Sequence, residues 1–127
     1  MKSVLVLVSL LAGLILWPVT AGVRGELAAS FEVAQGRYRV LAFGLPAPGH
    51  DEYERILRER YGIEMRRVAG CVVSAWQVAY WEGYNSVSED AANRKFGHDV
   101  FQESDAEAGR MWRVRQTPIQ TQCPGFP

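Results

Sequence analysis

The sequence has few of the side chains from which enzymes most often build a catalytic centre. Its 127 residues include two histidines and two cysteines. The motifs G-x-S-x-G, C-x-x-C, G-x-G-x-x-G and the P-loop are all absent from it. These gaps argue against an α/β-hydrolase, a thioredoxin-like oxidoreductase and the nucleotide-binding folds that use those glycine motifs. No cofactor is predicted.

An excess of charge of either sign is also lacking, since 14 Lys and Arg residues balance 14 Asp and Glu residues. Without a positive surplus, the chain is not expected to bind nucleic acid. Segment 51–64, DEYERILRERYGIE, interleaves acids with bases and is typical of a solvated helix face.

What the sequence does contain is an apolar run near its start, from Val4 to Trp17 after Lys2. Pro18 and the small-residue sequence Val19-Thr20-Ala21 follow it, an order typical of a secretory signal peptide that is cleaved after Ala21. An uncleaved anchor is the alternative, although a membrane-spanning helix needs about 20 apolar residues. We therefore expect an exported protein, periplasmic or extracellular, with no stable membrane anchor after cleavage. Its expected partner is another exported or envelope protein.

The two cysteines, Cys71 and Cys123, suggest a disulfide, because exported proteins meet an oxidising environment. The letters VAGC at 68–71 look like a lipoprotein lipobox, but they lie about fifty residues beyond the apolar run and cannot become a lipidated N-terminus. A Cys71–Cys123 bond would close a loop of about fifty residues, which stabilises by about 4 kcal/mol in the chain-entropy estimate. The alternative is a buried free Cys71 with Cys123 in a loose tail.

Two strands are predicted, over 37–45 and 63–73. The adjacent Arg66 and Arg67 interrupt the alternation of the second strand, which indicates a bulge. Because two strands make a small sheet, a third strand from Glu26 to Val33 is expected to pair at an edge. A helical crossover between the first two would make them parallel.

Three helices are predicted as well. Asp51 stands at the N-cap position of an amphipathic helix over 51–61, and Ser74 caps a long helix of about six turns that ends before Gly97. The capping-box spacing from Ser104 predicts a third, shorter helix. The long helix should turn one apolar stripe toward the core: Trp76, Tyr80, Gly83, Val87 and Ala91. Because glycine costs about 1 kcal/mol in an exposed helix, Gly83 indicates either close backbone packing or a kink.

These elements predict a small single domain of the α/β or α+β class, in the order β-α-β-α-α, with a two- to three-stranded sheet packed by a long amphipathic helix. The expected division is a signal peptide over 1–21, a weakly structured segment over 22–36, the globular domain over 37–113 and a C-terminal tail over 114–127. The predicted core consists of Tyr38, Val40, Leu41, Phe43, Ile56, Leu57, Ile63, Met65, Val68, Val72, Trp76, Tyr80, Val87 and Phe96.

Each of the two histidines precedes an aspartate, in the pairs His50-Asp51 and His98-Asp99. Together the pairs could supply metal ligands, but the long helix should place them at opposite ends of the domain. His50 and Asp51 are therefore a weak metal candidate, and a capping role for Asp51 is favoured. Cys71 with His50 is the remaining nucleophile candidate, because the ends of parallel strands meet at one edge.

A cluster of aromatic residues in the long helix is the candidate for a partner surface. Trp81 and Tyr84 fall beside the predicted core stripe, next to Glu82 and Asn85, and at least one of the two rings is expected to be partly exposed. The alternative, which is the more common arrangement for a wide helical stripe, is that both rings pack into the core. We favour a non-catalytic binding or interaction module over the alternative, a small hydrolase or metal-dependent enzyme that uses His50, Asp51 and Cys71.

Overall fold

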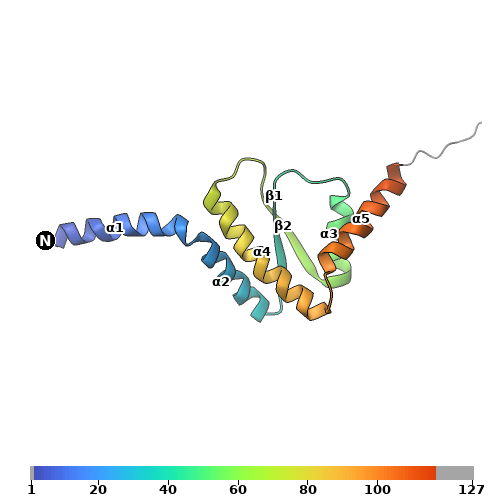
Figure 1. Ribbon diagram of the computed structural model, residues 1–127, viewed down its shortest axis with the longest axis horizontal. Helices are drawn as coiled ribbons and strands as arrows, with labels where there is room; N and C mark the ends of the chain where they lie inside the picture. The colour runs from blue at the N-terminus through green and yellow to red at the C-terminus, as the bar shows by residue number, and fades with distance from the viewer. Residues whose placement is uncertain (1, 117–127) are drawn as a thin grey trace, which may run out of the picture.

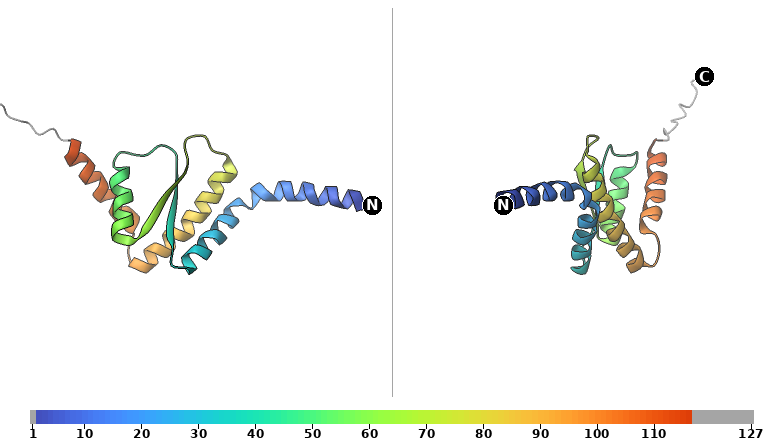
Figure 2. Two further views of the ribbon diagram at one scale, coloured as in Figure 1. Left: turned by 180° about the vertical axis from the view of Figure 1, so that it is seen from behind. Right: turned by 60° about the vertical axis from the view of Figure 1, so that its left-hand side comes forward.

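The computed structural model describes residues 2–116 and shows a small single domain of the α+β class, from which one helix projects (Figures 1 and 2). Its elements, in chain order, are α1 (Lys2–Val19), α2 (Ala21–Ala34), β1 (Tyr38–Phe43), α3 (His50–Tyr61), β2 (Ile63–Ala69), α4 (Ala75–Phe96) and α5 (Val100–Gln116). The predicted order β-α-β-α-α is present from β1 onward, and two helices precede it.

The sheet has two strands, β1 and β2, which run parallel as predicted, with Tyr38 opposite Ile63 at the start. Helix α3 is the crossover between them. The register shifts after Ala42, which pairs with Arg67, whereas the next residue pairs with Ala69. The extra residue is Val68, so the bulge lies one position beyond the predicted arginine pair.

Glycines end two of the helices as the sequence predicts. Gly62 and Gly97 adopt the left-handed conformation, with φ of +66° and +77°, which glycine reaches without a steric penalty. Ser74 caps α4 as predicted, and its backbone N–H donates to the Gln77 side-chain oxygen at 2.9 Å.

Two predicted caps are wrong. The N-cap of α3 is Gly49, and Asp51 lies inside the first turn, where its charge still favours the positive end of the helix. Helix α5 begins before Ser104, at Val100, because Asp99 Oδ1 accepts hydrogen bonds from the N–H groups of residues 101 and 102 at 3.1 and 3.0 Å. Ser104 is instead a fully buried residue of the helix interior.

The prediction for residues 22–36 is also wrong. They hold neither a third strand nor a weakly structured segment, since Ala21–Ala34 is helix α2, which packs along α4 (Figure 1). Helices α2 and α4 are in contact through backbone atoms at two glycines. A methyl group added to Gly25 would lie 2.0 Å from the Tyr80 carbonyl oxygen, and one added to Gly83 would lie 2.3 Å from the Gly22 carbonyl oxygen. Gly83 therefore serves close packing.

The core has two parts. Between the sheet, α3, α4 and α5 lies a cluster of Val40, Leu57, Ile63, Ala92 and Val100. Between α2, β1 and α4 lies a second cluster of Ala29, Leu41, Trp81 and Tyr84. Three predicted core residues are exposed instead: Phe43 at 37%, Trp76 at 43% and Val72 at 97%. All three lie where the chain leaves a strand or enters α4.

Helix α1 stands away from the domain (Figures 1 and 2), and its large apolar side chains are exposed. Within residues 2–116, no helix by itself combines the length and the apolar composition needed to cross a membrane. Segments Val4–Val19 and Ala21–Ala34 meet that standard as a pair, joined at a bend of 67°.

Removing the charge of Glu89 on α4 is expected to stabilise the protein near neutral pH. Burial raises the pKa of the Glu89 carboxyl, and the charges of Asp99 and Asp90 raise it further. An acid whose pKa is higher in the folded state loses stability as pH rises, because the unfolded chain releases the proton more readily. We expect Glu89→Gln to raise the melting temperature at pH ~7, and to lose this advantage below pH ~4.

Thermal unfolding of Glu89→Gln and of the parent at both pH values measures this effect. Glu82→Gln is the matched control, because Glu82 lies on the same helix and is exposed. It should change stability by no more than about 0.5 kcal/mol. A gain from Glu89→Gln that persists unchanged at acid pH would contradict the electrostatic explanation.

Candidate binding site at the carboxyl edge of the sheet

Both strands of the parallel sheet end at the same edge and lead into loops, residues 44–49 after β1 and 70–74 after β2 (Figure 1). The loops begin side by side, because the Gly44 N–H donates to the Gly70 carbonyl at 3.2 Å. Ligands of parallel α/β proteins bind beyond the carboxyl ends of the strands, since neighbouring loops converge there. The carboxyl edge is therefore the expected position of a binding site.

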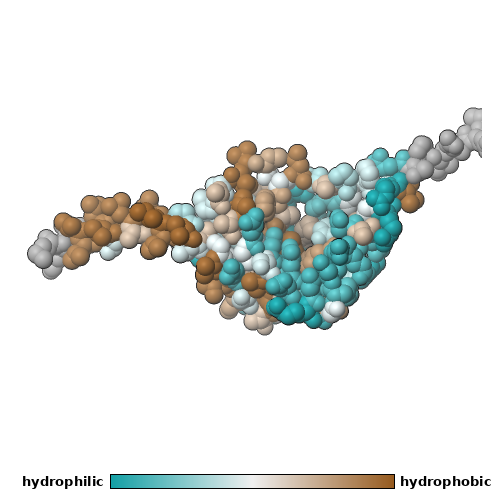
Figure 3. Space-filling model, viewed as in Figure 1, coloured by the Kyte–Doolittle hydropathy of each residue, from teal (hydrophilic) through white to brown (hydrophobic). Residues whose placement is uncertain are grey.

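The two loops present apolar side chains to solvent. Leu45 is 81% exposed and Val72 is 97% exposed, and Phe43, at the end of β1, is 37% exposed. The Phe43 ring packs on Trp81, with ring centroids 5.2 Å apart, and this contact anchors it to the core. Figure 3 shows the apolar residues gathered over the loops, in contrast to the hydrophilic surface of α5. We call Phe43, Leu45 and Val72 the loop surface.

A pocket with both polar and apolar lining residues lies beside the loop surface. Its volume is about 500 Å³, and it is lined by Pro46, Ala47, Pro48, Gly49, His50, Asp51, Glu52, Trp112, Arg115 and Gln116. At its base Glu52 is 8% exposed and pairs with Arg55 at 3.0 Å and with Arg115. Hydrogen bonds from these two guanidinium groups, Arg55 first, hold the pKa of the Glu52 carboxyl below its usual value.

Arg67 of β2 joins the pocket to the loop surface. Its guanidinium group donates to the Gly44 carbonyl at 3.0 Å and lies 2.9 Å from His50 Nε2. A guanidinium has only donors, so we assign Nε2 of His50 as the acceptor and place the imidazole proton on Nδ1. This contact occupies Nε2 of His50.

The structure does not bring the two histidine-aspartate pairs together. His50 lies at the pocket, whereas His98 follows the far end of α4 and pairs with Glu103, its Nε2 3.0 Å from the carboxylate. Within residues 2–116, no three His, Cys, Asp or Glu side chains are placed to hold a metal ion. Cys71 is exposed in its loop, and none of the hydrogen bonds of the described chain joins it to His50.

The alternative of a buried free Cys71 is wrong as to burial, because the thiol is exposed. Hydrophobic residues flank Cys71 in the sequence, but β2 ends at Ala69, so Cys71 lies in the following loop. Cys123 lies outside the described residues, so the disulfide between the two stays a prediction.

The predicted partner face on α4 is not on the surface. Trp81 and Tyr84 are 8% and 4% exposed, so the candidate partner face is wrong and the alternative, that both rings pack into the core, is confirmed, while Glu82 is exposed. The physical reason is that α4 is covered on two sides, by α2 and by β1. A one-sided helix would bury the predicted stripe, but this double cover turns Trp76 outward and the rings of residues 81 and 84 inward.

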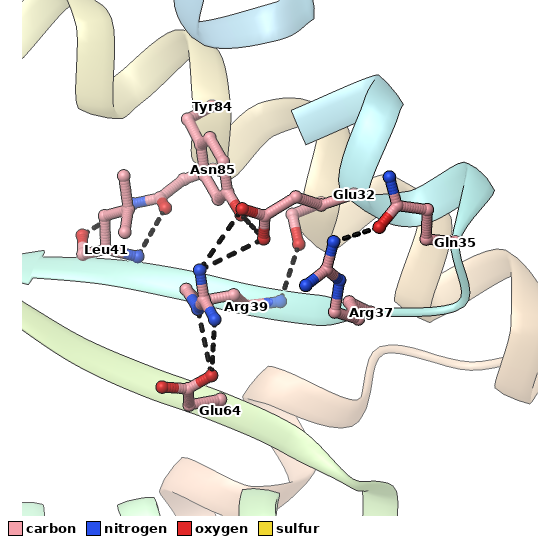
Figure 4. Close-up of polar contacts among 9 residues, drawn as sticks. Glu32, Gln35, Arg37, Arg39, Leu41, Glu64, Tyr84 and Asn85 are labelled. Carbon is pink, nitrogen blue, oxygen red and sulfur yellow. Dashed lines mark hydrogen bonds and ion pairs between the residues drawn. The ribbon is translucent and has the colours of Figure 1, made fainter. Parts of the chain in front are cut away.

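Two side chains of α4, Asn85 and Ser88, cover the free edge of β1, and Figure 4 shows Asn85 beside Leu41. The Asn85 amide accepts from the Leu41 N–H at 2.7 Å and donates to the Leu41 carbonyl at 2.9 Å. The Ser88 hydroxyl accepts from the Arg39 N–H at 3.2 Å. Asn85 is thus occupied by the backbone of the sheet and is not available to a ligand.

Arg39 of β1 links four elements, an arrangement that sequence reasoning missed. Its guanidinium contacts Glu32 of α2 at 3.2 Å and Glu64 of β2 at 2.8 Å (Figure 4). The Tyr84 hydroxyl of α4 donates to Glu32 at 2.7 Å, and burial together with this hydrogen bond raises the pKa of the Tyr84 phenol. Two features of the sequence could have indicated this contact. Glu32 lies in a segment of mostly small residues, and Arg39 lies in an apolar strand.

Comparison of the chain with protein-family models, with curated protein sequences and with solved structures found no match. The fold by itself defines a small α+β domain with a two-stranded parallel sheet.

Proposed function

We propose that the protein is an exported, non-catalytic binding module that holds a protein partner at the carboxyl edge of its sheet. The observation that carries this proposal is the exposure of Leu45 and Val72, at 81% and 97%, in two adjoining loops. Burying one such side chain against a partner stabilises a complex by about 1.5–3 kcal/mol. A small domain gains nothing for its own stability from exposing them.

The surroundings of the loop surface match the anatomy of a protein interface. Interfaces place apolar residues at the centre and polar residues around them. Here the apolar side chains stand beside a pocket in which His50 and Asp51 offer polar contacts and Trp112 offers an aromatic wall. A protein segment that covers the loops could place a side chain in that pocket.

Export is supported by the apolar run that forms α1 and by the pair of cysteines in the sequence. Binding is favoured over hydrolysis because His50 Nε2 contacts Arg67, a cation, where a general base would need a nucleophile as its neighbour. The partner is accordingly sought among exported and envelope proteins.

Photo-crosslinking in the intact host cell tests the proposal. A benzophenone amino acid at position 45 or 72 should form an adduct of one defined mass at each position. With the probe at Val72, the second change Leu45→Asp should reduce the adduct about tenfold or more, because it places a charge in an apolar contact. Neither position supports the domain core, so folding is not at risk.

A probe at Gln102 is the matched control, since this residue is exposed on α5, away from the loops. It should give no adduct. Equal adducts at positions 72 and 102, or an adduct at 72 that Leu45→Asp leaves unchanged, would show that the loop surface does not bind the partner.

A further inference from the structure

Helix α2 carries an apolar stripe that faces away from the domain. Val23, Leu27 and Phe31 recur at intervals of four, so they share one face of the helix, and they are 57%, 65% and 68% exposed. We call these three residues the α2 stripe. Val19, at the end of α1, extends the same spacing and is 75% exposed.

The α2 stripe cannot turn inward, because the opposite face of the helix is held against α4. Ala21 and Ala29 are completely buried on that face, and Gly25 lies in backbone contact with Tyr80. On the same side Glu32 pairs with Arg39 of the sheet. Whatever covers the stripe must therefore come from outside the domain.

The α2 stripe is continuous with α1, which is apolar all round. Every large apolar side chain of α1 is more than half exposed, from 54% at Leu11 to 76% at Leu14. A helix with no polar face is stable when protein or lipid surrounds it. Figure 3 shows this apolar surface running along α1 up to the domain, where polar residues of the body begin.

Aromatic and cationic residues mark the junction of the two helices. The Arg24 guanidinium lies 4.0 Å from the centre of a Trp17 ring and donates to the Trp17 carbonyl at 2.7 Å. Trp76, at the start of α4, lines a groove of about 670 Å³ with Leu14 and Trp17 of α1. Tryptophan concentrates at the boundary between lipid and water, and arginine extends its charge to that boundary.

The junction is also part of the folded domain. Ala21 is completely buried, and Gly22 packs against Gly83 of α4. Cleavage after Ala21 would remove the buried Ala21 and leave Gly22, at the contact with Gly83, as a positive terminus at the start of a helix, where the dipole is already positive. The structure thus favours retention of α1, the alternative to the cleavage that the sequence predicts.

We propose that α1 and α2 form a bent membrane anchor that stays on the protein. Helix α1 inserts into the bilayer, and α2 lies along the surface with the α2 stripe between headgroups and acyl chains. With α1 along the bilayer normal, the 67° bend lays α2 closer to the membrane plane than to the normal. The occupant of the stripe is lipid, because the stripe continues the lipid-seeking surface of α1.

This inference goes beyond the proposed function and uses a different surface. The loop surface projects from the domain in a direction different from that of α1 in all three views (Figures 1 and 2). Binding at the loops and insertion of the anchor can consequently fail independently. Attraction of the α2 stripe to lipid is apolar, so it should need no anionic lipid and should persist at high salt.

Site-specific fluorescence in vesicles tests the anchor. The full chain, with Cys71→Ser and Cys123→Ser, receives one new cysteine, labelled with nitrobenzoxadiazole, and is reconstituted into phosphatidylcholine vesicles. Positions 14 and 27 report on α1 and on the α2 stripe. We expect blue-shifted emission at both, and quenching by doxyl-labelled lipid. Position 58 is the matched control, because Arg58 is exposed at 61% on α3, and it should keep the emission of a label in water.

Two further measurements complete the test. Intact-mass analysis of protein from host membranes should find α1 still attached. With the label at position 23, Leu27→Glu should abolish lipid quenching while near-ultraviolet circular dichroism stays unchanged, since Leu27 contributes nothing to the core. Three results would each overturn the proposal. The label at position 27 could show the same emission as the label at position 58, it could be quenched by a labelled second copy of the protein in place of lipid, or the intact mass could show a chain that begins at Gly22.

Discussion

Replacing Gly25 by alanine is expected to destabilise the protein by about 3 kcal/mol or more, the upper end of the usual cost of overpacking. The added methyl group would lie 2.0 Å from the Tyr80 carbonyl oxygen and 2.9 Å from the Tyr84 nitrogen. Both are backbone atoms of α4, so no side chain can move aside. The two helices must separate, and the buried cluster of Ala29, Leu41, Trp81 and Tyr84 opens with them.

Urea unfolding followed by circular dichroism measures this loss. Gly109→Ala is the matched control, because Gly109 lies inside α5 and its added methyl group meets nothing nearer than an Arg113 nitrogen at 3.6 Å. That change should stabilise by about 1 kcal/mol, the intrinsic helix preference of alanine over glycine. If both substitutions shift stability in the same direction, the backbone contact of α2 with α4 is not as close as described.

Replacing Asn85 by leucine is expected to cost about 2 kcal/mol or more, although the volume changes little. The Asn85 amide satisfies both the N–H and the carbonyl of Leu41, which is 8% exposed. Leucine fills the same space and keeps water out, so both backbone groups lose their partner. Each unsatisfied buried group costs about 1–3 kcal/mol.

Hydrogen exchange distinguishes this mechanism from a general loss of stability. In Asn85→Leu the Leu41 amide should exchange faster, while amides inside α3 follow the global stability alone. Ser86→Ala is the matched control, since Ser86 is the next residue of α4 and is exposed. It should change stability by no more than about 0.5 kcal/mol. A Leu41 amide that stays protected in Asn85→Leu would contradict the role assigned to the side chain.

Local features were predictable wherever a short stretch of chain contains the whole cause. The parallel pair of strands, the glycine ends of α3 and α4 and the Ser74 cap all depend on neighbouring residues and on hydrophobic periodicity. Candidate sites were less predictable. His50 and Asp51 do lie at a pocket, but the partner face around Trp81 was wrong, because burial of a helix depends on how many neighbours cover it.

Helix α2 shows most clearly the difference between features with a local cause and features that depend on tertiary packing. Its sequence is rich in glycine and alanine and has weak amphipathic character, so periodicity alone did not distinguish it from a loosely structured segment or an edge strand. Its three small residues Ala21, Gly25 and Ala29 are spaced by four and form one narrow face of the helix. Such a face indicates close helix packing only when the neighbouring helix also has a small residue at the contact, and on α4 that residue is Gly83.

The amino-acid sequence therefore determined the order of strand, helix and strand, the ends of α3 and α4 and the apolar character of α1, because these follow from hydrophobic periodicity and from residues close along the chain. Tertiary packing decided which faces of α2 and α4 are buried, how the edge of β1 is covered by Asn85, and which apolar residues remain on the loop surface and the α2 stripe. The physical reason is that burial is a property of pairs of elements. The hydrophobicity of a residue such as Val72 or Trp81 is the same in the core and on the surface. Only the elements that pack against the residue decide whether it is buried or exposed.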